Sequence, residues 1–245
     1  MIKEVILSII QGITEFLPIS SSGHLAIFSN IFYNINLEVF SFLHLASLFA
    51  VIFFTRREIL YLLRFDKKAK EIFFFLIVAT IPAALFGYFL NEIIEKTFSS
   101  LLFIGISYLI NGTIILLTKF TRQNRGISLD KAIIIGIAQI FSLFPGISRS
   151  GITISTAKFL GIKNENAFNF SFLLFIPLSI GSFIIELKNP QALFSFKYLI
   201  IFIICAIVSF FSLKLLKRTI KKNNFWVFSF YCFILGILCL ILYFF

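Results

Sequence analysis

Six long stretches of almost unbroken apolar residues recur along the chain. Each is close to the roughly 20 residues that a helix needs to cross the hydrocarbon core of a bilayer. The pattern therefore predicts six membrane-spanning helices. They cover residues 38–55, 72–90, 101–117, 167–185, 198–213 and 225–245.

Two further apolar segments are each interrupted by a short polar turn. The first turn is part of Gln-Gly-Ile-Thr-Glu-Phe-Leu-Pro-Ile-Ser-Ser-Ser-Gly-His at 11–24, and the second is Pro-Gly-Ile-Ser-Arg-Ser-Gly at 145–151. Pro18 should end a helix, and Ser22 should cap the helix that restarts. Each half is too short to cross about 30 Å of hydrocarbon. Both segments are therefore predicted to be re-entrant hairpins, buried in protein or lining a cavity. The hairpins cover residues 3–33 and 131–161.

The two halves of the chain resemble each other. Sliding the first half along the second places Gln11 on Gln139 and Ser20 on Ser148. Each half then holds one hairpin and three spans, and because three is odd, the halves must cross the membrane in opposite directions. We expect an all-α polytopic integral membrane protein made of two inverted-topology repeats, with binding near the midplane where the interrupted helices meet. The repeats cover about 1–125 and 126–245 of a single membrane domain, 1–245.

Composition and charge support a membrane protein. Hydrophobic residues make up 59% of the chain and the mean hydropathy is +1.01, which no soluble domain of this size could bury. The net charge of +11 does not indicate nucleic acid, because the basic residues gather in short loops, as the positive-inside rule predicts. Lys158 and Lys163 are expected to be surface charges of this kind. The loops placed in the cytoplasm are 56–70, 119–131, 158–163 and 214–222.

With this topology, the first hairpin enters the membrane from the outside and the second from the cytoplasm.

The cysteines, Cys205, Cys232 and Cys239, all lie in apolar spans and lack metal-binding spacing. We interpret them as small buried hydrophobic residues.

The ionisable side chains of the two turns are the candidate chemistry, because such groups are costly inside a membrane and mark functional sites. If the turns meet, Arg149 faces Glu15, Ser20, Ser21 and His24. Arg149 is a charged fork suited to phosphate oxygens. A serine could act as the nucleophile and His24 as a general base or acid. Together these are the parts of a phosphoryl-transfer site.

Further groups of the two turns could bind phosphate or a cation. Gln11 and Glu15 are four residues apart and share one helix face. Glu15 could hold a divalent cation through its carboxylate, with the Gln11 carbonyl as a weaker ligand. The second turn should add phosphate-binding groups, because helix N-termini favour anions. The substrate-binding candidates are Gln11, Ser20, Ser148, Ser150 and Gly151.

Each candidate also has a purely structural interpretation. Glu15 and Arg149 could form only a buried ion pair that holds the repeats together. Ser22 and Ser150 are more typical of helix caps and hairpin packing. His44, alone on an apolar span, is more typical of a core histidine, and we leave it out of the site.

The two motifs resemble those of the undecaprenyl-diphosphate phosphatase family, the BacA/UppP type, and the resemblance covers the whole chain. It implies hydrolysis of undecaprenyl diphosphate to the monophosphate, which recycles the lipid carrier for peptidoglycan and other wall polymers and confers bacitracin resistance. It implies that Glu15 is an essential acid and that His24 and Arg149 are motif residues, with Ser20 and Ser21 as a serine pair. It also implies dependence on Mg²⁺ or Ca²⁺. Gln11 stands where the family pattern allows either Glu or Gln. With Gln the site has one charge fewer, which argues against a cation bridged by two carboxylates.

The mechanism expected from these assignments has Ser21, assisted by His24, attacking the terminal phosphorus. His24 itself or a metal-activated water is the alternative nucleophile. The substrate would enter from the outer face of the bacterial inner membrane, with its prenyl chain among the spans. Membrane lipids are the other expected partners, nucleic acid is not, and a homodimer is left open.

The alternative function is a polyprenyl-phosphate flippase or an anion transporter on the same inverted repeat. A carrier needs the positive clamp of Arg149. It does not need a nucleophile with a base three residues further along the chain.

Overall fold

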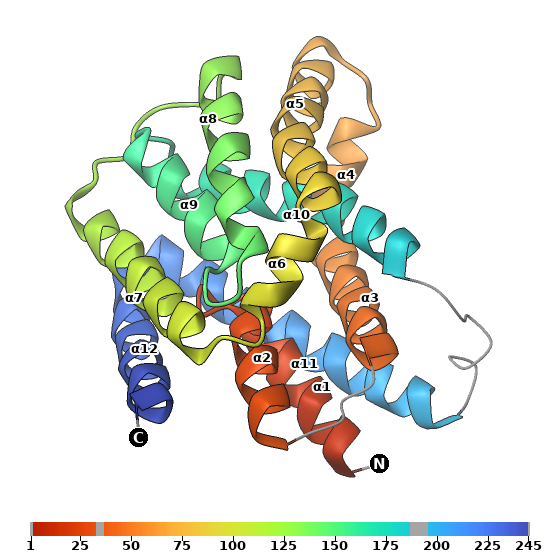
Figure 1. The fold of residues 1–245 in the computed structure, drawn as a ribbon. Helices are drawn as coiled ribbons and strands as arrows, with labels where there is room; N and C mark the ends of the chain where they lie inside the picture. The colour runs from red at the N-terminus through yellow and green to blue at the C-terminus, as the bar shows by residue number, and fades with distance from the viewer. Residues whose placement is uncertain (1, 33–36, 187–195, 245) are drawn as a thin grey trace.

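The computed structural model describes residues 2–32, 37–186 and 196–244, which form twelve α-helices joined by turns and short 3₁₀ segments (Figure 1). Five of the described helices are long and apolar enough to cross a membrane. This confirms the predicted all-helical, multi-pass membrane protein. The five are α5 (Lys67–Phe89), α7 (Leu101–Leu117), α10 (Asn164–Glu186), α11 (Phe196–Lys221) and α12 (Phe228–Phe244).

The remaining predicted span, 38–55, corresponds to α3 (Leu37–Phe54), whose described apolar part, Phe42–Phe54, is shorter than the other five. Two short helices, α4 (Arg56–Leu62) and α6 (Asn91–Thr97), flank α5 at its two ends. Pro82 lies inside α5 and Pro177 inside α10. Neighbouring helices can make such interruptions tolerable in a membrane protein.

Both interrupted segments form helix hairpins at the predicted places. The first consists of α1 (Ile2–Thr14) and α2 (Ser21–Phe32). The second consists of α8 (Leu129–Gln139), the 3₁₀ segment Ile140–Leu143 and α9 (Arg149–Phe159). In Figure 1 the two hairpins approach each other near the centre of the molecule.

The predicted cap of α2 was wrong by two residues. Ser20, not Ser22, precedes the helix, and its Oγ accepts a hydrogen bond from the Gly23 N–H at 3.2 Å. Ser148 plays the same part for α9, accepting from the Gly151 N–H at 3.1 Å. A capping oxygen has to lie just before the first turn to reach these free N–H groups. Ser20 can do so because its φ of 61° turns the chain into α2.

Close helix packing surrounds the hairpins. The α1 helix packs against α11, α8 packs against α5, and α7 pairs with α12 along its length. Glycine permits two of these contacts: a Cβ at Gly136 would lie 2.6 Å from the Ala79 carbonyl oxygen, and one at Gly105 would lie 3.0 Å from that of Gly236. Small residues at such interfaces let helices approach closely in membranes. The second hairpin is therefore packed closely on α5, and α7 closely on α12.

Apolar side chains enclose the first turn. Phe16 is fully buried, and its ring lies 5.6 Å from each of the rings of Phe172 and Phe175 on α10. Both contacts are edge-to-face, a favourable arrangement for aromatic pairs. The polar residues that follow Phe16 are thus fixed against α10. All three cysteines are buried, as predicted.

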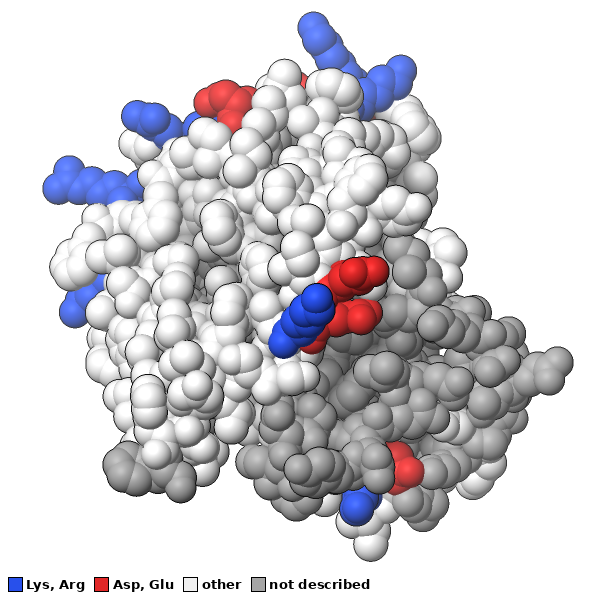
Figure 2. All heavy atoms as spheres, viewed as in Figure 1, with Lys and Arg blue, Asp and Glu red and all other residues white. Residues whose placement is uncertain are grey.

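The basic side chains gather mainly at one end of the molecule. Figure 2 shows them along the upper end, over the beginnings of α5 and α8, while a group of acidic side chains with one basic neighbour lies lower on the same face. Lys163 is exposed as expected, but the prediction for Lys158 was wrong. Lys158 is only 2% exposed, because its Nζ turns inward and donates to Asn164 Oδ1 at 2.9 Å.

Candidate active site

The two hairpin turns are in direct contact. The Gly146 N–H donates to Ser20 Oγ at 3.1 Å, and Ser150 Oγ donates to the Phe16 carbonyl at 2.8 Å. Ser148 Oγ lies 3.1 Å from Ser150 Oγ and 3.5 Å from the Leu17 carbonyl. The turns therefore meet, as the predicted site required. In this structure, however, Ser148 and Ser150 direct their hydroxyls to the protein itself.

Asn111 on α7 joins the two turns through its side-chain amide. Its Nδ2 donates to the Pro18 carbonyl at 3.0 Å, and its Oδ1 accepts from the Ser148 N–H at 3.2 Å. The side chain is fully buried. Sequence reasoning missed this residue, although a single asparagine within an apolar span is a usable signal, because polar groups inside a membrane are rarely without a role.

Glu15 is the centre of a polar cluster at the end of α1. Its Oε2 accepts from Ser21 Oγ at 2.5 Å and from Gln11 Nε2 at 2.7 Å. The structure adds His44, whose Nδ1 lies 3.6 Å from the same oxygen and 3.3 Å from Gln11 Nε2. Our interpretation of His44 as a core histidine outside the site is therefore not supported: its side chain is 31% exposed and faces the carboxylate.

The structure does not bring His24 to Ser21. The His24 Nδ1 lies 2.7 Å from the Ser20 carbonyl oxygen, and Nε2 lies 2.7 Å from the hydroxyl of Tyr231 on α12. Over the described residues, Ser21 and His24 share no hydrogen bond, and the hydroxyl of Ser21 points to Glu15 instead. The carboxylate is thus the base closest to the predicted nucleophile. Sequence reasoning missed Tyr231, because nothing in the sequence distinguishes it from the other tyrosines, of which the chain has seven in all.

Arg149 stands at the first turn of α9, on the hairpin that faces Glu15. Its Nη1 donates to Ser179 Oγ at 3.3 Å, and its guanidinium carbon lies 4.6 Å above the ring of Phe175. Among the described side chains, no carboxylate lies within ion-pair distance of Arg149, although Glu15 is near enough to interact with it electrostatically. The interpretation as a simple structural ion pair is therefore not supported. Most N–H donors of the Arg149 guanidinium remain for an anion, and the positive N-terminal end of α9 adds to the attraction for that anion.

The cluster also offers oxygen atoms to a cation. Gln11 Oε1 is buried and has no hydrogen-bond partner, which is unusual for a buried polar atom. It lies on the side chain that donates to Glu15, so a carboxylate and an unpaired amide oxygen are side by side. Mg²⁺ and Ca²⁺ prefer such oxygen ligands, and Mg²⁺ commonly takes its remaining ligands from water and phosphate. The described residues contain no group of three or more His, Cys, Asp or Glu side chains arranged for a metal.

Taken together, these features define a class: a multi-pass membrane protein with a polar, phosphate-suited site between two broken helices. The chain belongs to the family described as bacitracin resistance protein BacA, whose sequence profile matches residues 4–238.

Similar proteins come from both archaea and bacteria. The undecaprenyl-diphosphatase of Methanococcus maripaludis strain C7 is 42% identical over 241 residues, covering 95% of this chain and 96% of that protein. The undecaprenyl-diphosphatase of Thermosipho melanesiensis is 39% identical, covering 98% of both chains. Undecaprenyl-diphosphatase 2 of Bacillus thuringiensis strain Al Hakam is 39% identical, covering 98% of this chain and 97% of that protein. These similarities confirm the family resemblance seen in the motifs.

Proposed function

We propose that this protein hydrolyses undecaprenyl diphosphate to undecaprenyl phosphate and inorganic phosphate. Family membership and the names of its relatives support this activity. The observation that carries the proposal is the pairing of Ser21 Oγ with Glu15 Oε2 at 2.5 Å, opposite an Arg149 without a paired carboxylate. A transporter of anionic lipids would need the arginine, but it would not need a hydroxyl held against a base.

The pairing suggests how the first chemical step proceeds. Ser21 Oγ attacks the terminal phosphorus while its proton passes to Glu15, and the bond from that phosphorus to the bridging oxygen breaks. Undecaprenyl phosphate leaves, and water then releases phosphate from the serine. Arg149 binds the phosphate oxygens, whose charge is spread over the transferred group in the transition state. If no phosphoserine can be trapped in an active preparation, water is the nucleophile and Glu15 its base.

Glu15 and the unpaired Gln11 Oε1 are the residues that would hold Mg²⁺ or Ca²⁺. Such a cation would neutralise phosphate charge. The Gln11 amide nitrogen meanwhile keeps the carboxylate oriented through its 2.7 Å hydrogen bond.

The helix contacts support the proposed inverted repeat. If α1 corresponds to α8 and α5 to α11, the contact of α1 with α11 has a counterpart in the contact of α8 with α5. Likewise, α3 with α10 and α7 with α12 would each pair two corresponding helices, and both pairs are in contact. We further propose that the basic end faces the cytoplasm and that the site opens to the outer face of the cell membrane. There it would recycle the lipid carrier for wall polymers and confer resistance to bacitracin.

Phosphate release from undecaprenyl diphosphate by the purified protein in detergent tests the proposal. Transport requires a membrane that separates two compartments. Detergent micelles have none, so the assay reports hydrolysis alone. We expect release that EDTA abolishes and added Mg²⁺ or Ca²⁺ restores, and that falls at least 100-fold in Glu15→Gln, the scale of a lost general base. Glu95→Gln, which removes an exposed carboxylate on α6, is the matched control. A folded wild type that releases no phosphate with cation present would disprove the proposal and direct the work to lipid transport in vesicles.

A further inference from the structure

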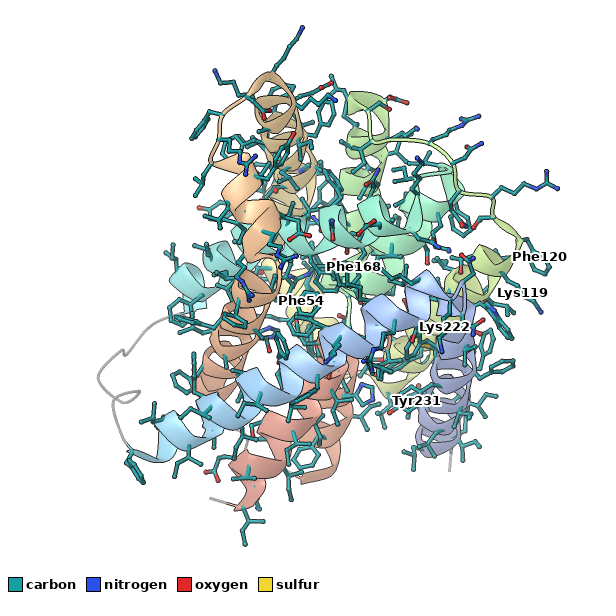
Figure 3. The ribbon with its side chains drawn as sticks, turned by 180° about the vertical axis from the view of Figure 1, so that it is seen from behind. Phe54, Lys119, Phe120, Phe168, Lys222 and Tyr231 are labelled. Atoms are coloured by element: carbon teal, nitrogen blue, oxygen red, sulfur yellow. The ribbon has the colours of Figure 1, made fainter. Side chains whose placement is uncertain are left out.

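His24 is held between two tyrosines from different helices. The ring of Tyr231 stacks on it, with centroids 5.6 Å apart and planes 16° apart. The ring of Tyr108, on α7, meets it edge-to-face at 6.0 Å. Figure 3 labels Tyr231 on α12, on the side that faces the first hairpin. Three helices therefore fix the orientation of one imidazole.

The hydrogen bonds also fix which nitrogen of His24 carries the proton. A carbonyl oxygen only accepts, so the 2.7 Å contact to the Ser20 carbonyl places the proton on Nδ1 of the neutral ring. The Nε2 lone pair then accepts from the Tyr231 hydroxyl at 2.7 Å. The Tyr108 hydroxyl donates to the same Ser20 carbonyl at 3.2 Å, and its oxygen lies 2.9 Å from the protonated Nδ1, from which it can accept.

The two tyrosines differ in accessibility. Tyr108 is fully buried, and a Cβ at Gly23 would lie 2.6 Å from its hydroxyl, so it is locked beside the turn. Tyr231 is 42% exposed. The reactive nitrogen of His24 therefore points toward an accessible side chain and away from the buried pair of Ser21 and Glu15.

We infer, given the proposed phosphatase activity, that Tyr231 is a positioning residue for His24. Its hydroxyl keeps Nε2 aimed at the exposed side chain of Tyr231, where His24 handles a proton separate from the one that Ser21 gives to Glu15. The site thus divides proton transfer between Glu15 on the nucleophile side and His24 on the side of Tyr231. Tyr108 and the Ser20 carbonyl hold the other edge of the ring.

Tyr231→Phe removes the hydroxyl and keeps the stacked ring. We expect kcat for phosphate release to fall about 10-fold, the lower end of what outer partners of functional side chains contribute, with KM unchanged. In Tyr231→Ala, which also loses the stacked ring, kcat should fall further. Tyr243→Phe is the matched control, because Tyr243 lies on the same helix, is 50% exposed and packs against Phe244 without contacting the site.

Nitrogen NMR of the detergent-solubilised protein, labelled with ¹⁵N-histidine, gives a readout that mere packing would not change. The chain has only two histidines, so His44→Asn leaves His24 alone in the spectrum. We expect Nδ1 of His24 to be protonated, and the Nε2 signal to move downfield in Tyr231→Phe but not in Tyr243→Phe.

Two outcomes would overturn the inference: an unchanged Nε2 signal in Tyr231→Phe, or an unchanged kcat in that variant beside an active wild type. If KM rises while kcat stays unchanged, Tyr231 binds substrate directly instead of positioning His24. Failure of the proposed function looks different, because the wild type itself would then release no phosphate.

Discussion

Glu15 shows how a single carboxylate can organise a site inside a membrane. One of its oxygens accepts from both Ser21 and Gln11, and His44 approaches the same oxygen from α3. A buried charge needs such partners, because an isolated carboxylate in a low-dielectric setting is very costly. The arrangement that stabilises the charge is also the one that places a base on the serine hydroxyl.

His44 should contribute to this arrangement, although it comes from another helix. Removing it in His44→Asn takes away the imidazole that faces Glu15 and Gln11, and we expect phosphate release to fall about 10-fold. Ser47→Ala is the matched control: Ser47 is buried on the same helix, but it contacts Ser209 at 3.2 Å on α11 and lies outside the site. Equal activity of the two variants would mean that His44 only fills space.

Gly23 is predicted to be irreplaceable for a steric reason. Alanine usually favours a helix over glycine, but a Cβ at this position would come within 2.8 Å of three atoms of the Tyr108 side chain. Gly23→Ala should therefore displace Tyr108, lower stability by about 1–3 kcal/mol and reduce phosphate release. Gly181→Ala on α10, where a Cβ meets nothing within 4 Å, should be neutral or stabilising. Thermal unfolding in detergent compares the two, and equal melting temperatures would contradict the clash.

At the scale of elements, the hairpins were predictable because their sequence signals are local. Pro18 and Pro145 and the serine-glycine pairs lie within a few residues of the turns they shape. The cap was misplaced because Pro18 limits the residue before it, whereas the start of α2 is set by the backbone of Ser20, which no local pattern revealed. The motif residues of the candidate site were predicted for the same local reason. His44, Asn111 and Tyr231 were not, since each reaches the site from a distant span.

Asn111 is the element-scale link between the hairpins, and its loss should loosen both. In Asn111→Leu the Ser148 N–H loses its acceptor and the Pro18 carbonyl loses its amide donor, a cost of about 1–3 kcal/mol for buried groups left unpaired. Thr113→Val on the exposed face of the same helix should cost little. Hydrogen exchange followed by mass spectrometry should show faster exchange over 144–151 only in Asn111→Leu. Unchanged exchange there would mean that other contacts hold the turns together.

At the scale of the whole molecule, the distribution of charge predicts which way the site faces. The basic residues around α4, the start of α5 and the start of α8 lie at one end, and the acidic helix α6 follows the opposite end of α5 (Figures 1 and 2). Under the positive-inside rule, the basic end would be cytoplasmic, as proposed above. An enzyme that acts on a lipid diphosphate at the outer surface then needs its first hairpin to open away from that end.

Cysteine labelling in intact cells tests this orientation with two exposed positions at the two ends of α5. A membrane-impermeant maleimide should label Glu92→Cys in intact cells, and Lys68→Cys only after the membrane is opened. The parent protein should give no background, since Cys205, Cys232 and Cys239 are all fully buried. The reverse pattern would place the basic end outside. Glu15 and Arg149 would then have to meet their substrate from the cytoplasm, and the proposed role in recycling carrier lipid at the outer face would fail even if the purified protein were an active phosphatase.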